Sequence, residues 1–224
     1  MIIAIIPARG GSTRLPRKNI RELKGKPLIS YSIDACKNSG LVDKIIVSSE
    51  DKEVLDISEN LGAVPHLRPK KLAIEVTNNE LAETKQYVLS EFNPSQFLFL
   101  LPTYPFRSIK LIKDTIEHLK TSKYVISQTI LRQNGLELLS AQPEKGFSNL
   151  LPEGTIVQRN SYLNAGNSKP FPDSIKQRYY RYNVNEIENI DIDTPLDWVK
   201  AELVIEKGLY DFSTGEVAKW PINF

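Results

Sequence analysis

Short hydrophobic runs recur along the first 130 residues, and each is followed by a segment with helical spacing. The runs are rich in β-branched and other apolar residues without polar alternation, which is typical of strands buried on both faces of a sheet. We predict strands at 1–6, 44–48, 63–67, 96–101 and 124–130. Strands that alternate with helices of about 10–15 residues indicate right-handed crossovers in a parallel sheet. The predicted fold class is therefore α/β, a mostly parallel Rossmann-like sheet wrapped by helices.

Residues that favour helix ends separate these strands. Pro27 suits a first helical residue with Gly40 as the terminator, and Asp51 suits the N-cap of a helix that ends before Gly62. Thr77 and Glu80 are spaced as a capping box for a helix to about residue 92. A further helix over 109–119 has its apolar residues on one face.

The alternation stops after residue 130, where Gly, Asn, Pro and Ser accumulate around one short run at 155–157. We interpret 131–178 as an insertion or lid on one edge of the sheet, within a single domain that spans 1–224. A strand is predicted at 179–190. Thr194, Pro195 and Asp197 then fit the N-cap, first residue and N3 acid of a helix to about Glu206.

Composition narrows the functional classes. The 29 basic and 27 acidic residues leave a net charge of +2. The chain therefore lacks the overall positive charge typical of nucleic-acid-binding proteins, and any anion site is local. The apolar runs are far shorter than the roughly 20 residues that span a bilayer, and no basic leader precedes the first run. A single cysteine, Cys36, excludes an internal disulfide and suits a reducing cytosol. We expect a cytoplasmic protein that binds neither nucleic acid nor membrane.

The first candidate site is the loop that follows the first strand. Gly10, Gly11 and Ser12 allow backbone amides to approach an anion without Cβ interference. Arg9, Arg14, Arg17 and Lys18 place four cations within ten residues, which suits a polyphosphate. The alternative is a solvated basic turn, which is less favoured directly after a core strand. Neither the Walker pattern nor GxGxxG occurs, so a nucleotide would be bound by a loop of a different type.

The second candidate site is the Asp191-Ile192-Asp193 segment. In an extended chain the two carboxylates lie on one face, and Mg²⁺ commonly takes one or two carboxylates together with phosphate oxygens. The alternative, weighed about equally, is a polar strand end in which Asp193 helps to cap the following helix.

Several ordered motifs resemble the cytidylyltransferases that activate eight- and nine-carbon sugar acids, a family that includes CMP-sialic acid synthetases and their pseudaminic, legionaminic and Kdo relatives. The motifs are IPARGGSTRLPRKNI (6–20), GKPLISYSI (25–33), VDKIIVSSEDKEV (42–54), GAVPHLRPKKLA (62–73), LLPTYPFRS (100–108) and IDIDTPLDW (190–198).

The resemblance implies a nucleotide-diphospho-sugar transferase-like fold and a reaction in which a sugar's anomeric hydroxyl attacks the α-phosphate of CTP and releases pyrophosphate. It implies a homodimer that uses CTP, a sugar acid and Mg²⁺, with Asp191 and Asp193 as metal ligands. The implied catalytic residues are Arg9, Lys18, Asp191 and Asp193. The implied nucleotide-binding residues are Ala8, Arg9, Gly10, Gly11, Ser12, Lys18, Asn19, Arg68 and Asn79. The implied sugar-binding residues are Leu101, Thr103, Arg107 and Gly154.

The sequence departs from the family pattern on the sugar side. Leu101 stands where the family usually has Gln before Pro-Thr-Ser-Pro, and Glu75 stands where it has Asp. The segment at 153–157 lacks the usual Asn and Tyr, and 131–152 is short and has no clear Arg-Arg-Gln motif. Because the nucleotide-side motifs are retained, these departures indicate an acceptor other than ordinary sialic acid, or weakened activity.

Three hypotheses follow. The leading one is a cytidylyltransferase that makes a CMP-activated sugar acid for a bacterial surface glycan. The second is a nucleotidyltransferase for another small acceptor, such as a different sugar or a polyol phosphate. The third is a catalytically weak or silent homologue that binds nucleotide or serves as a scaffold in a glycan pathway. The retention of Arg9, Lys18, Asp191 and Asp193 disfavours it, and the loss of the sugar-side Gln favours it.

Overall fold

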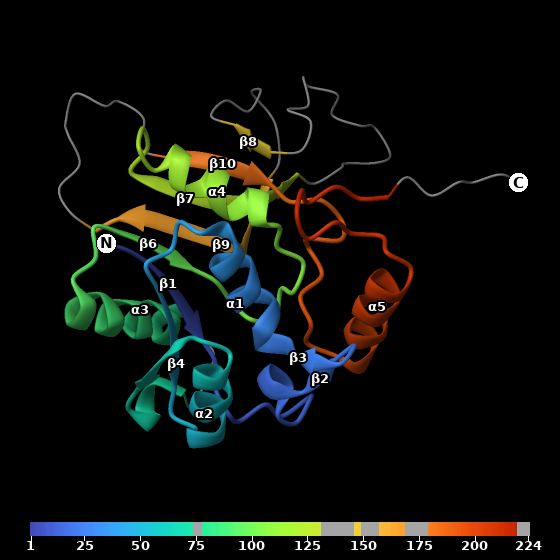
Figure 1. The fold of residues 1–224 in the computed structure, drawn as a ribbon, viewed down its shortest axis with the longest axis horizontal. Helices are drawn as coiled ribbons and strands as arrows, with labels where there is room; N and C mark the ends of the chain where they lie inside the picture. Colours follow the sequence, from blue (N-terminus) through green and yellow to red (C-terminus); the bar gives the residue numbers. More distant parts are fainter. Residues whose placement is uncertain (74–77, 131–145, 149–156, 169–178, 219–224) are drawn as a thin grey trace, which may run out of the picture.

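A single eight-stranded sheet forms the centre of the protein, in the order β5-β4-β1-β6-β9-β7-β10-β8 (Figure 1). The computed structural model describes residues 1–73, 78–130, 146–148, 157–168 and 179–218. The strands are β1 (Ile2–Pro7), β4 (Lys44–Ser49), β5 (Val64–Leu67), β6 (Gln96–Phe99), β7 (Tyr124–Ile130), β8 (Gly146–Ser148), β9 (Val157–Asn167) and β10 (Tyr179–Asn183). Only β8 and β9 run antiparallel to their neighbours, which confirms the mostly parallel α/β prediction.

The predicted helices all form, with ends within a few residues of those expected. They are α1 (Leu28–Ser39), α2 (Lys52–Asn60), α3 (Asn78–Phe92), α4 (Ile109–His118) and α5 (Pro195–Glu206), with short 3-10 turns at Lys18–Ile20 and Lys70–Ala73. Asp51 caps α2 as predicted, because its carboxylate accepts from the Val54 N–H. Thr194 and Asp197 form a reciprocal capping box at the start of α5. A small hairpin, β2 (Glu22–Leu23) and β3 (Lys26–Pro27), leads into α1.

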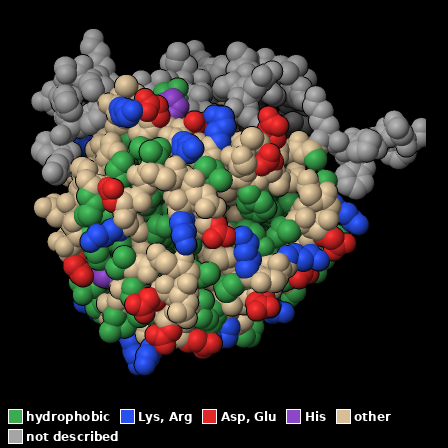
Figure 2. All heavy atoms as spheres, in the orientation of Figure 1, with side chains coloured by type: hydrophobic (Ala, Val, Ile, Leu, Met, Phe, Trp, Pro, Cys, Tyr) green, Lys and Arg blue, Asp and Glu red, His purple; other side chains and the backbone are tan. Residues whose placement is uncertain are grey.

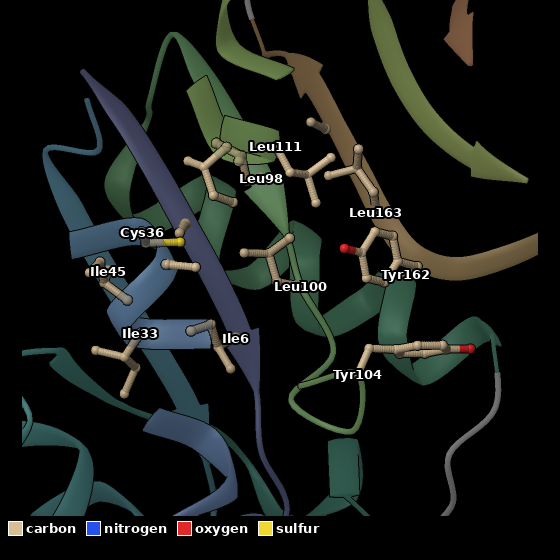
Figure 3. Close-up of a cluster of buried hydrophobic side chains, with 14 of the residues drawn as sticks. Ile6, Ile33, Cys36, Ile45, Leu98, Leu100, Tyr104, Leu111, Tyr162 and Leu163 are labelled. Atoms are coloured by element: carbon tan, nitrogen blue, oxygen red, sulfur yellow. The ribbon is translucent and has the colours of Figure 1, made fainter. Parts of the chain in front are cut away.

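Alternate residues of β1 explain how helices cover both faces of the sheet. Ala4 and Ile6 point to the face that α1 and α4 cover, in the cluster of Figure 3. Ile3 and Ile5 pack on the opposite face in a cluster that includes Val88 of α3. A strand with both faces buried has no polar alternation, as the first run of the sequence showed.

Cys36 lies inside the first of these clusters and is fully buried (Figure 3). Burial raises the pKa of its thiol to about 12. The side chain is therefore a small core residue, not a nucleophile.

The structure corrects the interpretation of the segment after residue 130. Residues 157–167 form β9, which pairs with both β6 and β7 in the middle of the sheet and is not part of an edge insertion. Tyr162, Leu163 and Ala165 are buried there. The strand predicted at 179–190 is shorter, because β10 ends at Asn183 and a turn follows.

The surface carries charges of both signs. On the face shown in Figure 2, basic and acidic side chains are interspersed over the helices and form no patch of one sign. Across the described ranges, none of the helices combines the length and apolarity that a bilayer crossing demands.

Candidate active site

A cavity of about 360 Å³ opens at the carboxyl ends of β1, β5 and β6, the edge at which open α/β sheets bind ligands. Its volume falls within the range of small-molecule sites. It is lined by Pro7, Arg9, Ser12, Thr13, Arg14, Leu15, Lys18, Asn19, Arg68, Leu72, Ala73, Glu80, Leu81, Leu101, Pro102, Thr103, Asp191 and Asp193. Residues between Pro7 and Asn19 therefore meet Asp191 and Asp193 in one site, although some 170 positions separate the two segments in the sequence.

The first loop supplies the basic wall of this cavity. Arg9, Ser12 and Lys18 line it, and Arg9 has no ion pair within the described residues. Asn19 is buried; its amide donates to the Arg9 carbonyl at 2.9 Å, while its Oδ1 has no hydrogen-bond partner. A buried acceptor without a donor is costly, so this oxygen is suited to a ligand N–H or O–H.

Four residues of the first loop are used differently from what the sequence predicts. The Gly10 N–H donates to Glu50 Oε1 at 2.8 Å, and the Ala8 N–H donates to the Ser48 carbonyl at 3.0 Å. Neither amide is free for a phosphate. Arg17 pairs with Asp51 and Glu53 and does not line the cavity. Gly11 is exposed and likewise lies outside the cavity lining.

Glu50 connects the first loop to Arg68. The guanidinium of Arg68 donates to Glu50 Oε2 at 3.1 Å and to Thr84 Oγ1 at 3.3 Å, and the side chain is almost fully buried. Burial lowers the pKa of Arg68, against the opposing effect of Glu50. Glu50 thus holds two walls of the cavity together, a role that the sequence analysis missed. The sequence did contain a signal for this role, because Glu50 is an acidic residue directly after the buried strand β4.

Asp193 lies between two basic side chains of the first loop. Lys18 Nζ donates to Asp193 Oδ1 at 2.7 Å, and Arg14 donates to the other oxygen. Partial burial acts to raise the pKa of Asp193, but the hydrogen bonds and charges of Lys18 and Arg14 outweigh it and lower that pKa. The carboxylate is therefore held in its charged form at the mouth of the site.

Asp191 also lines the cavity, and its buried Oδ1 has no hydrogen-bond partner. Ile192, between the two aspartates, is fully buried and donates its N–H to the Thr103 carbonyl at 2.8 Å. The cap of α5 is formed by Thr194 and Asp197, so the capping explanation for the Asp193 side chain is wrong.

On the predicted sugar side, Leu101 and Thr103 line the cavity together with Pro102. Arg107 does not: it is completely buried in the core and bonds to backbone and hydroxyl oxygens. Asn79 belongs to the first turn of α3, but its side chain is outside the described part of the structure. Gly154 is outside the described residues altogether. Glu80 and Leu81 of α3 line the cavity and were not predicted.

Comparison with known proteins agrees with the fold. Among solved structures, a CMP:2-keto-3-deoxy-manno-octonic acid synthetase complexed with CTP superposes with a TM-score of 0.68 at 13% identity, over 93% of this chain and 99% of that one. The two chains therefore share a fold.

In sequence, residues 3–191 match the cytidylyltransferase family. The CMP-N,N'-diacetyllegionaminic acid synthase of Legionella pneumophila is 34% identical over 227 residues, which cover 92% of this chain and 96% of that protein. The pseudaminic acid cytidylyltransferase of Campylobacter jejuni is 51% identical over 72 residues, 32% of this chain and 31% of that protein. The chain belongs to the cytidylyltransferase family.

Proposed function

We propose that this protein transfers CMP from CTP to the anomeric hydroxyl of a sialic-acid-like sugar acid and releases pyrophosphate, for the synthesis of a bacterial surface glycan. The observation that carries the proposal is the single cavity in which the cationic first loop faces Asp191 and Asp193. In the reaction the sugar oxygen forms a bond to the α-phosphorus while the bond from that phosphorus to the bridging oxygen breaks. The oxygen loses its proton, and pyrophosphate carries away the charge.

The basic side chains would act on the triphosphate. Arg9 is available for a phosphate, and Lys18 and Arg14 already lie at the carboxylate edge of the site. Cations fixed where the pyrophosphate charge develops stabilise the transition state more than the ground state. Most of the rate acceleration would therefore come from positioning and charge neutralisation, as in phosphoryl transfer.

Asp191 and Asp193 fit a Mg²⁺ ion that enters with the nucleotide. Within the described ranges there is no group of three or more acidic, His or Cys ligands, so the protein offers two carboxylates and leaves the remaining positions to phosphate oxygens and water. The unpartnered Oδ1 of Asp191 favours a cation nearby. When bound, Mg²⁺ supplies charge neutralisation on the phosphate oxygens.

Leu101 and Pro102 favour an acceptor with an apolar substituent on the sugar side of the cavity. An apolar wall cannot hydrogen-bond the polar group that a Gln would hold, and a site built to form such a bond discriminates more strongly than an apolar wall does. Similarity to the legionaminic acid synthase along nearly the full length supports acceptors of the legionaminic or pseudaminic type over ordinary sialic acid. We propose a cytoplasmic homodimer, which light scattering of the purified protein would test.

Pyrophosphate release from CTP and Mg²⁺ with a panel of N,N'-diacetyllegionaminic, pseudaminic, sialic and Kdo acids tests the proposal. We expect release only when a sugar acid is present, with a diacetamido sugar acid preferred to sialic acid. ATP, GTP and UTP should give little release. CTP at about 100 times its dissociation constant should stabilise the fold by about 2.7 kcal/mol. Equal stabilisation by all four triphosphates, or no release with any acceptor, would contradict the proposal.

A further inference from the structure

Arg107 is a buried cation without an acidic partner. The whole side chain is inaccessible to solvent, and no carboxylate pairs with it in the described part of the chain. Burial lowers the pKa of its guanidinium. An unpaired buried charge costs several kcal/mol, and an apolar side chain of similar volume would avoid that cost. The position of Arg107 therefore calls for an explanation beyond filling the core.

The guanidinium joins three separate elements. Its Nη2 and Nε donate to the Tyr162 carbonyl of β9 at 2.9 and 3.3 Å, and its Nη1 donates to Ser32 Oγ of α1 at 2.8 Å. Nη1 also donates to the Tyr104 carbonyl, within the loop that follows β6. The planar fork of an arginine suits such a set of acceptors in different directions.

The Tyr162 carbonyl is available because β9 is irregular at this point. Along β9, the residues paired with β7 jump from Arg159, opposite Gln128, to Asn164, opposite Ile126, so Tyr162 lies between the two ladder segments. The Tyr162 hydroxyl donates to the Phe106 carbonyl at 2.6 Å, and its ring meets that of Tyr104 edge-on at 5.9 Å (Figure 3). Arg107 and Tyr162 together thus fix the loop that contains Tyr104 and Phe106.

This same loop forms part of the active-site cavity. Leu101 and Thr103 line the cavity, and the Thr103 carbonyl accepts the N–H of Ile192, between the two aspartates. A displacement at Tyr104 would be transmitted through Thr103 to the segment that contains Asp191 and Asp193. The first loop has its own bonds, to Glu50 and within itself, and it meets the aspartate segment where Lys18 and Arg14 donate to Asp193.

We propose that Arg107 is a positioning residue that fixes the 101–106 loop and, through Thr103 and Ile192, the carboxylates of Asp191 and Asp193. The inference rests on the proposed function. It separates two halves of the site: the first loop binds the triphosphate independently of Arg107, whereas the carboxylates and the acceptor wall depend on Arg107.

Arg107→Met and Arg107→Lys test this assignment. Since misplacement of a reacting group by about 1 Å can cost about 100-fold in rate, we expect kcat of Arg107→Met to fall by about that factor. The dissociation constant of CTP in EDTA should change by less than about threefold, because the bonds of the first loop to Glu50 and within itself involve no partner of Arg107. Arg107→Lys keeps the charge but loses the planar fork, so an intermediate kcat is expected. Mn²⁺ affinity of the CTP complex, followed by electron paramagnetic resonance, should weaken in the same order.

Two controls keep the result interpretable. Val88→Ala removes buried volume in the cluster on the opposite face of the sheet, against which Leu101 packs, and gives a loss of stability without removing any partner of Arg107. Ser32→Ala removes one Arg107 acceptor on α1, and it decides the question if Arg107→Met does not fold. We expect kcat of Ser32→Ala to fall several-fold while CTP affinity in EDTA is kept.

A parent protein without CMP transfer would refute the proposed function. An active parent whose Arg107→Met or Ser32→Ala variant keeps its kcat and Mn²⁺ affinity would refute the positioning role. Each variant is assayed at a temperature equally far below its own melting temperature. If Val88→Ala then loses as much kcat as Arg107→Met, the positioning role is also refuted.

Discussion

Replacement of Gly10 by alanine should disrupt the first loop, whereas the same change at Gly11 should not. A Cβ on Gly10 would lie 2.6 Å from both Cβ and Cγ of Asp51, and closer still to Oδ2. Asp51 cannot move away cheaply, because it caps α2 and pairs with Arg17. The loop itself must therefore shift by about 1 Å to regain ordinary contact distances of roughly 3.5 Å.

The structure allows the cost to be estimated. A shift of the loop breaks the bond from the Gly10 N–H to the Glu50 carboxylate, which is worth about 1.5–3 kcal/mol. Strain on the Asp51 cap adds about 0.5–2 kcal/mol. We expect the free energy of unfolding to fall by about 2–5 kcal/mol, or about 4–20 °C in melting temperature for a chain of this size. CTP affinity should fall as well, because Arg9 and Ser12 flank the displaced residue.

Thermal melting and CTP titration of Gly10→Ala and Gly11→Ala provide the comparison. A Cβ on Gly11 would meet no atom within 4 Å, so that variant should match the parent. Adding Asp51→Ala to Gly10→Ala should not restore stability, since the Asp51 Cβ itself is 2.6 Å away. Equal behaviour of the two glycine variants would refute the steric argument.

Three further changes test the site. Lys18→Ala should weaken CTP binding by about 1.5–3 kcal/mol, roughly 10- to 100-fold, with the fold retained, and unchanged CTP affinity would contradict the assignment. Asp191→Asn and Asp193→Asn should each remove most turnover across a Mg²⁺ titration at near-parent melting temperature; an unchanged rate and metal dependence would argue against a metal site. The hydrogen bond from Arg17 lowers the pKa of Asp51 in the folded protein. The charged Asp51 carboxylate therefore stabilises the fold at pH values above its pKa in the unfolded chain, and this stabilisation is lost as the pH falls through its pKa in the folded protein. The stability gap between parent and Asp51→Asn should therefore shrink at acidic pH, and a constant gap would contradict the ion-pair explanation.

Apolar runs and cap residues predicted most of the fold, because buried parallel strands and helix ends leave a local signal in the sequence. The strand β9 has no such local signal in its sequence. Its sequence, VQRNSYLNAGN, contains three Asn and has no clear apolar period, and only its neighbours β6 and β7 determine its place in the sheet. Residues 184–190 were predicted to continue the strand, but the Asn185 side chain accepts from the Ile187 and Glu188 N–H groups and begins a turn there.

The candidate site was predicted at the level of segments rather than of individual side chains. Both motifs reach the cavity as predicted, since strand ends of a parallel sheet share one edge. The roles of Gly10, Arg17 and Arg107 could not be predicted, because residue type does not show which way a side chain or an amide points. Each has an oxygen partner far away in the sequence: Glu50, Asp51 and Tyr162.

The late position of β9 along the chain also affects how the protein can be divided. Strands β6 and β7 have no direct ladder between them, and both hydrogen-bond to β9. A fragment that ends before Val157 would therefore leave two strand edges open at the centre of the sheet, and unpaired edges promote association with other chains. During synthesis the backbone ladders of the two halves stay unconnected until residue 167 is available, so chaperone protection would matter most in that interval.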